Sequence, residues 1–138
     1  MNITKNPDKL VNNGARLQFL KAEEKRLSED MAELREKAAY FSSSQLSHSP
    51  KAQGGKRDVY AEFLVSLENL ETIMLANLHS ILKERLKLEQ DIGRVKDVEM
   101  RLLLRLRLIN GLNWFEIGEE FNTDRTSAAK KFKRILKI

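Results

Sequence analysis

Apolar residues in the first third of the chain recur with the period of a helix packed against another helix. A helix can begin at Asn6-Pro7-Asp8, and only Gly14 interrupts helix-forming residues from there to Phe41. The apolar positions are Leu17, Leu20, Leu27, Met31, Leu34, Ala38 and Phe41. Their spacing alternates between three and four once Glu24 is included, which is a heptad repeat. Such a stripe needs a partner helix, either in the same chain or in another copy.

A second long helix is predicted from Val59 to about Val95. Its stripe consists of Tyr60, Phe63, Leu67, Leu70, Met74, Leu78, Ile81, Leu88, Ile92 and Val95, with Arg85 at one inward-facing step. Residues 42–58 between the helices are rich in Ser and Gly and contain Pro50, which indicates a flexible linker. Because the linker allows a reversal, residues 7–96 are predicted to form an antiparallel helical hairpin or coiled-coil arm. The two helices pair either within one chain or between chains.

Three shorter helices are predicted in residues 97–138, after a possible cap at Asp97. The first ends near Ile109, the second extends from Trp114 to Phe121, and the third runs from Asp124 to the last residue. Gly111 can adopt the left-handed conformation that ends the first helix. Asn113 and Glu116 have the spacing of a capping box, and Asp124 can cap the last helix. The short joint between the last two helices fits a compact three-helix, helix-turn-helix DNA-binding domain over residues 97–138.

The last helix is basic on its exposed side and apolar on the other. No acidic residue follows Asp124. The predicted helix-turn-helix core is Trp114, Ile117, Phe121, Ala128, Phe132 and Ile135. The residues predicted to read base edges are Arg125, Thr126, Ser127, Ala129 and Lys130, near the start of the helix. Those predicted to contact DNA phosphates are Lys131, Lys133, Arg134 and Lys137. The alternative is a solvated basic helix with no role in nucleic-acid binding.

A resemblance to a known family appears in the segment RLLLRLRLINGLNWFEIGEEFNTDRTSAAKKFKRIL. It resembles the sigma-factor-region-4-like helix-turn-helix of phage late-gene transcriptional regulators of the ArpU/RinA type. The LR-x-x-x-G-x-x-W-x-x-I run of that family is matched by Leu106, Arg107, Gly111, Trp114 and Ile117. SPKAQGGKRDVYAEF also resembles the stretch between the family's helices. The resemblance implies an activator of late genes, encoded by a phage of Gram-positive bacteria.

Composition narrows the classes of function further. The formal net charge of +5 is compatible with a polyanionic partner. There is no cysteine, which excludes disulfides and thiolate metal sites, and no apolar run approaches the length of a membrane span. The two histidines, His48 and His79, lie in different predicted segments, and no catalytic constellation emerges. We therefore expect a protein of the bacterial host cytoplasm that is not an enzyme, with no cofactor, metal or membrane partner.

These patterns together predict a sequence-specific, DNA-binding transcriptional regulator. Its partners are expected to be double-stranded DNA and further copies of the chain, joined through the coiled coil as a homodimer or higher oligomer. RNA polymerase is a further candidate partner. Two alternatives stay open. One is a DNA-packaging protein of the small-terminase type, and the other is a protein-interaction module that docks on RNA polymerase or on another regulator.

Overall fold

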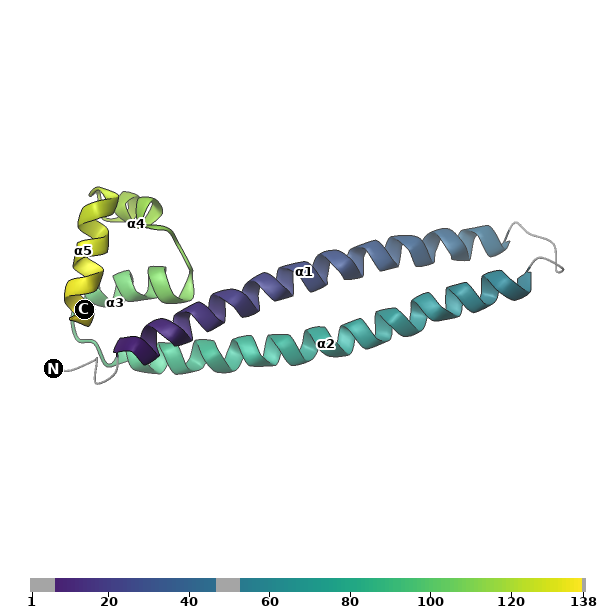
Figure 1. Ribbon diagram of the computed structural model, residues 1–138, viewed down its shortest axis with the longest axis horizontal. Coiled ribbons are helices and arrows are strands. Elements are labelled where there is room, and N and C mark those ends of the chain that lie inside the picture. The colour runs from purple at the N-terminus through teal and green to yellow at the C-terminus, as the bar shows by residue number, and fades with distance from the viewer. Residues whose placement is uncertain (1–6, 47–52, 138) are drawn as a thin grey trace. The chain divides into compact units, whose positions relative to one another are not determined.

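The computed structural model describes residues 7–46 and 53–137 (Figure 1). All regular structure in these residues is helical, which confirms the predicted all-α fold. The elements are α1 (Pro7–Leu46), α2 (Gln53–Gly93), α3 (Val98–Leu104), the π-helix η2 (Arg105–Ile109), α4 (Trp114–Glu120) and α5 (Arg125–Leu136). A long helical hairpin thus precedes the three predicted short helices, the first of which consists of α3 and η2 joined without a break.

Helix extends into both ends of the stretch predicted as a linker. α1 continues to Leu46 and α2 begins at Gln53, so the described helices occupy 42–46 and 53–58. The serines at 42–44 can continue α1 because serine costs only a fraction of a kcal/mol relative to alanine in a helix. The remainder of the predicted linker, residues 47–52, including Pro50, lies outside the described residues.

The first long helix packs against the second along the predicted heptad stripe. Leu17, Met31 and Ala38 of α1 are buried. The other stripe positions, from Leu20 to Phe41, are half-buried. The aromatic ring of Phe41 lies on that of Phe63 in α2, with the ring centroids 5.2 Å apart. The 3–4 spacing read from the sequence therefore identifies the packed face of α1.

The packed face of α2 differs from the predicted stripe at two positions. Asn77 and Glu84 are buried, whereas the predicted Leu78 and Arg85 are exposed. The real seam passes through residues 70, 74, 77, 81, 84 and 88, which keeps the alternation of three and four that a heptad requires. The predicted stripe was drawn through apolar residues and therefore departs from this spacing.

Both buried polar residues of α2 have partners on α1. The Asn77 side-chain amide donates a hydrogen bond of 3.1 Å to the Glu24 carboxylate. The guanidinium of Arg16 lies 3.2 Å from the Glu84 carboxylate. A buried polar group is tolerated when it is hydrogen-bonded or paired, and polar positions of this kind can fix the register of two helices. Glu24, the single polar step in the α1 stripe, is thereby explained.

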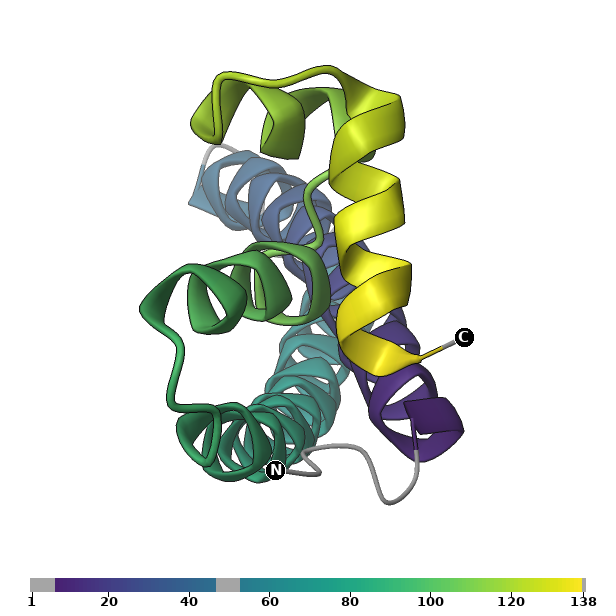
Figure 2. The same cartoon turned by 90° about the vertical axis from the view of Figure 1, so that its left-hand side faces the viewer.

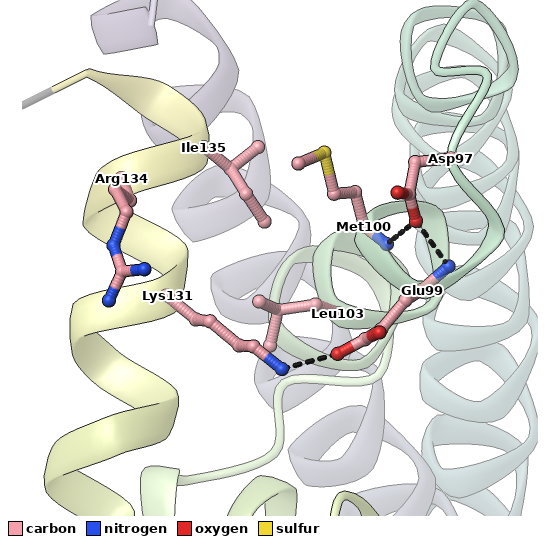
Figure 3. Close-up of a pocket in the computed structure, with 7 residues that line it drawn as sticks. All are labelled: Asp97, Glu99, Met100, Leu103, Lys131, Arg134 and Ile135. Atoms are coloured by element: carbon pink, nitrogen blue, oxygen red, sulfur yellow. Dashed lines mark hydrogen bonds and ion pairs between the residues drawn. The ribbon is translucent and has the colours of Figure 1, made fainter.

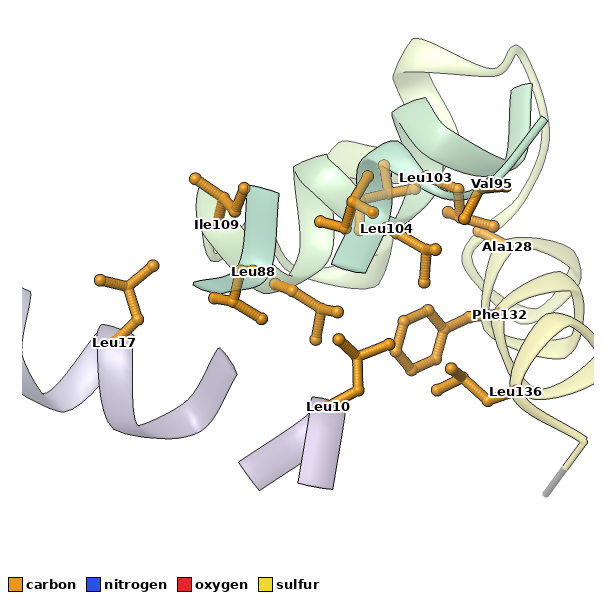
Figure 4. Packing of buried hydrophobic residues seen from close by; sticks show 13 residues of the cluster. Leu10, Leu17, Leu88, Val95, Leu103, Leu104, Ile109, Ala128, Phe132 and Leu136 are labelled. Carbon is orange, nitrogen blue, oxygen red and sulfur yellow. The ribbon is translucent and has the colours of Figure 1, made fainter. Parts of the chain in front are cut away.

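The chain divides into two compact units, residues 1–21 with 80–138 and residues 22–79. The first unit has one continuous apolar core (Figure 4). The core residues are Leu10, Leu17, Leu88, Ile92, Val95, Leu103, Leu104, Leu108, Ile109, Ile117, Ala128, Phe132 and Leu136. Five of these thirteen precede residue 97, so the packing crosses the domain boundary predicted between residues 96 and 97.

The helix predicted to end near Ile109 changes its pitch before it ends. Over Arg105–Ile109 the backbone is a π-helix, and the Asn110 N–H donates to the Arg105 carbonyl, five residues earlier, at 3.0 Å. The wider turn places two adjacent pairs in the core, Leu103 with Leu104 and Leu108 with Ile109. An α-helix would not repeat the same face after five residues.

The carboxyl end of η2 is bound by side chains of α1. The Gln18 amide donates to the carbonyls of Leu108 and Ile109, at 3.0 Å each, and the Lys21 ammonium donates to the Ile109 carbonyl. Burial, followed by the nearby charge of Arg85, lowers the pKa of Lys21. Gly111 has φ +69°, and a Cβ there would meet the Gln18 side chain at 2.2 Å. Its predicted left-handed conformation is confirmed.

We predict that Leu17→Ala destabilises the helix-turn-helix although Leu17 lies about ninety residues before it in sequence. Leu17 is fully buried in the shared core, so the substitution should lower the free energy of unfolding by about 2–5 kcal/mol. Urea unfolding followed by the fluorescence of Trp114, the single tryptophan, measures this directly. Phe19→Ala is the matched control, because Phe19 is 77% exposed and should change stability by about 0.5 kcal/mol at most. Equal effects of the two substitutions would contradict the shared core.

Candidate nucleic-acid interface

The helix α4 starts with a complete capping box. The Asn113 side chain accepts a hydrogen bond from the Glu116 N–H at 2.8 Å, and the Glu116 carboxylate accepts one from the Asn113 N–H at 3.0 Å. The predicted capping box is thus confirmed. Two backbone N–H groups that a helix start leaves unpaired are satisfied, which fixes where α4 begins.

A tight turn joins α4 to α5, and the two helices meet at a steep angle (Figures 1 and 2). Asn122 takes the left-handed conformation with φ 53°, and the Thr123 N–H donates to the Gly118 carbonyl at 2.8 Å. A Cβ at Gly118 would lie 2.7 Å from the Thr123 carbonyl oxygen. Only glycine lets the turn lie this close to α4, a role that the sequence interpretation missed. A glycine inside a seven-residue helix was the available signal.

The helix α5 is capped by Asp124. Its carboxylate accepts a hydrogen bond from the Ser127 N–H at 2.7 Å, as predicted. Hydrogen bonding to Ser127, above all to its backbone N–H, lowers the pKa of Asp124. Ser127 is one of the residues predicted to read bases. Its hydrogen bond to Asp124 holds the first turn of α5 in place.

One side of α5 packs into the core of the unit. Ala128 and Phe132 are buried, Ile135 is half-buried, and Leu136, absent from the predicted core, is fully buried. The predicted core residues of α4 lie opposite them: Ile117 is buried, and Trp114 and Phe121 pack against the cluster. The Trp114 ring lies 5.1 Å from the Phe132 ring, centroid to centroid. Trp114 is therefore a packing residue whose ring faces the core.

The other side of α5 carries the predicted DNA-contacting residues. Arg125, Thr126, Ser127 and Lys130 are exposed around the first turns, and Ala129 is half-buried. Lys133, Arg134 and Lys137 are exposed farther along. Lys130, Lys133 and Arg134 have the i, i+3, i+4 spacing of one helical face, and Lys137 follows as the left-handed residue that ends the helix. These exposed basic residues follow the cap with no acidic residue between them.

Lys131, one of the predicted phosphate contacts, already has a partner. Its ammonium forms an ion pair with the Glu99 carboxylate of α3 (Figure 3). The same ammonium lies 5.6 Å from the centroid of the Phe121 ring. It lies on the flank of α5 that faces α3, away from the row formed by Lys130 and Lys133. Its assignment to phosphate remains a prediction, and the contact would require this ion pair to open.

A pocket of about 380 Å³ lies beside this ion pair, between α3 and α5 (Figure 3). Its apolar surface comes from Met100, Leu103 and Ile135. Its charged rim comes from Asp97, Glu99, Lys131 and Arg134. Asp97 accepts hydrogen bonds from the N–H groups of Glu99 and Met100, so the rim includes the capped start of α3. An apolar side chain of moderate size could enter the pocket between charges of both signs.

Within residues 7–46 and 53–137 there is no group of three or more side chains suited to hold a metal ion. Among the helices described, none is long and apolar enough to cross a membrane. The exposed side chains and the shape of α4 and α5 suit the binding of a partner of complementary charge and shape.

The capped α4, the tight turn and the basic α5 define a helix-turn-helix unit. Residues 41–137 match the model of the DUF1492 family, described as proteins of unknown function, and the chain belongs to that family. No curated protein and no solved structure matches the chain. The family assignment covers α2 and the four helical elements after it, α3, η2, α4 and α5.

We predict that Gly118→Ala weakens the fold of the helix-turn-helix. Its Cβ would collide with a backbone carbonyl that cannot rotate away, so the free energy of unfolding should fall by about 1–3 kcal/mol. Gly93→Ala is the matched control, because nothing lies within 4 Å of a Cβ at Gly93. Thermal unfolding of both variants gives the comparison. If Gly118→Ala were as stable as Gly93→Ala, the turn would not need glycine.

Proposed function

We propose that the protein binds duplex DNA in a sequence-specific manner through α5 and regulates transcription. The observation that carries this proposal is the exposed basic face of α5, which is free of acidic residues after Asp124 and begins at a capped, exposed helix start. Phosphates attract such a face, and its first turn is narrow enough to enter the major groove. The helix-turn-helix geometry supports the same assignment.

In this proposal the two ends of α5 have different tasks. Arg125 and Lys130, with Thr126, Ser127 and Ala129 beside them, read base edges. An Arg or Lys side chain there can donate to guanine O6 and N7. Lys133, Arg134 and Lys137 neutralise phosphates and set the orientation of the helix.

The finer proposal is a phage late-gene activator of the ArpU/RinA type. Its support is the matched run of residues, several of which lie together in the structure. The Arg107 guanidinium lies 4.3 Å from the centroid of the Trp114 ring and donates to the Leu112 carbonyl at 2.9 Å. Gly111 provides the left-handed residue between Arg107 and Trp114, and the Ile117 side chain is buried in the core. The run therefore has a common structural role, joining η2 to α4.

Assembly into a homodimer or a higher oligomer completes the proposal. Two linked helix-turn-helix units would bind a two-part site with an increased effective concentration for the second contact. The described α1 and α2 pair with each other within one chain. A self-association surface must then lie outside their shared seam.

A second candidate function is docking on another protein, such as RNA polymerase. The observation that favours it is the pocket between α3 and α5, with Met100 40% exposed at its surface. Docking there would involve Arg134, which DNA binding also uses. Binding of duplex DNA at low salt separates the two candidates.

We predict that single substitutions on α5 divide into two groups in DNA binding. After selection of bound sites from random duplexes, anisotropy titrations at several salt concentrations would measure affinity and preference. Each of Lys133→Ala, Arg134→Ala and Lys137→Ala should weaken binding to all sequences and reduce the log–log salt slope by about 0.9. Arg125→Ala and Lys130→Ala should instead lose about 1–3 kcal/mol of discrimination at particular base pairs.

Arg35→Ala is the control for charge alone, because Arg35 is exposed on α1 in the other compact unit. It removes one positive charge and should leave both slope and preference nearly unchanged. If the five α5 substitutions left duplex affinity untouched at low salt, the DNA-binding proposal would be wrong, and the docking candidate would replace it.

A further inference from the structure

The helix α2 carries a second apolar face that no described residue covers. Leu75 is 62% exposed, Leu78 45%, Leu82 63% and Leu86 57%. Their spacing of three, four and four places them on one side of a single uninterrupted helix. The seam against α1 uses other positions, including Asn77, Ile81 and Glu84. The two faces of α2 are therefore distinct.

The second face arises from the register of the seam. Because Asn77 and Glu84 occupy inward positions, Leu78 and Arg85 turn outward and join Leu75 and Leu82 on the exposed side. Polar residues inside and leucines outside reverse the usual distribution for a two-helix hairpin. A helix that is apolar on two faces is typical of one that packs on both.

Two charges of opposite sign flank the middle of this face. From Val59 to His79 the helix contains three glutamates and no Lys or Arg, whereas the stretch from Ser80 to Gly93 contains Lys83, Arg85 and Lys87 together with Glu84, Glu89 and Asp91. On the face itself, Glu71 lies seven residues before Leu78, and Arg85 lies seven residues after it. Seven residues are about two helical turns, so both charges stand on the same side as the leucine.

We propose that this face binds the same face of a second copy of the chain, with the two α2 helices antiparallel. Centred on Leu78, such a pair places Glu71 opposite the partner's Arg85, and Leu75 within one residue of the position opposite the partner's Leu82. A parallel pair would place equal charges opposite each other, which destabilises an interface. A two-fold axis makes each contact occur twice. The proposal deepens the proposed assembly by naming its surface and orientation.

The surface is tested by Leu75→Gln combined with Leu82→Gln in the full chain. Sedimentation equilibrium without DNA should show a dimer for the unaltered protein, and a dimer dissociation constant at least about 100-fold higher for the variant. Its helicity should be unchanged, since both leucines lie outside the core. Ile73→Gln is the matched control, because Ile73 is 51% exposed on the opposite side of α2. A monomeric unaltered protein, or a variant that remains dimeric, overturns the proposal.

The orientation is tested by exchanging charges. Glu71→Lys alone and Arg85→Glu alone should each weaken the dimer, by about tenfold, because each places equal charges opposite each other. The two substitutions together should restore it, since the opposite charges are then only interchanged. If the double variant dimerises more weakly than either single variant, with the two effects adding, the antiparallel arrangement is wrong.

Failure of this inference is distinguishable from failure of the proposed function. The mass measurement contains no DNA, and anisotropy with duplex DNA is a separate measurement. If the protein dimerises but binds no DNA, the proposed dimer surface is supported and the proposed function is wrong. If the unaltered protein binds DNA as a monomer, the proposed dimer surface is wrong and the proposed function is supported.

Discussion

The helix-turn-helix depends on hydrogen bonds that reach it from the beginning of the chain. Gln18 and Lys21 of α1 donate to the last carbonyls of η2, groups that a helix end leaves without partners. Leu10 and Leu17 of the same helix lie in the core beneath. The position of α4 and α5 within the unit is therefore determined by α1 as well as by their own short sequences. The proposed DNA binding would need such a support, because positioning decides which side chains reach the bases.

Local signals made much of the fold predictable. The caps at Asn113 and Asp124 and the left-handed Gly111 depend on neighbouring residues only, and the sequence shows them directly. The heptad spacing of α1 was readable for the same reason. The inward-facing positions of α2 could not be predicted in this way, because Asn77 and Glu84 are stabilised by partners that come from α1. A hydrophobic pattern cannot indicate a buried polar residue whose partner is distant in sequence.

The candidate site shows the same division. The two faces of α5 follow from periodicity, so the exposed positions of Arg125, Lys130 and Lys133 and the buried position of Phe132 could be anticipated. The ion pair that holds Lys131 to α3 depended on packing between elements and could not be anticipated. The fully buried Leu136 lies four residues after Phe132 on the same helical face, and Gly118 stands inside a short helix. Both therefore had a sequence signal that the interpretation missed. The core beneath the site also includes Leu88 and Ile92 of α2, which no motif of the last forty residues contains.

The π-helical turn at Arg105–Ile109 has a consequence for how the chain tolerates changes in length. A π-turn holds about one residue more than an α-turn, so this segment behaves like an α-helix that has absorbed a single-residue insertion. Deleting one residue there would remove the wide turn and leave a plain α-helix. Leu108 and Ile109 would then stand four residues after Leu103 and Leu104, so both pairs would keep the same face toward the core. A second deletion would find no extra residue to remove, and it would rotate everything that follows by about 100° relative to α3.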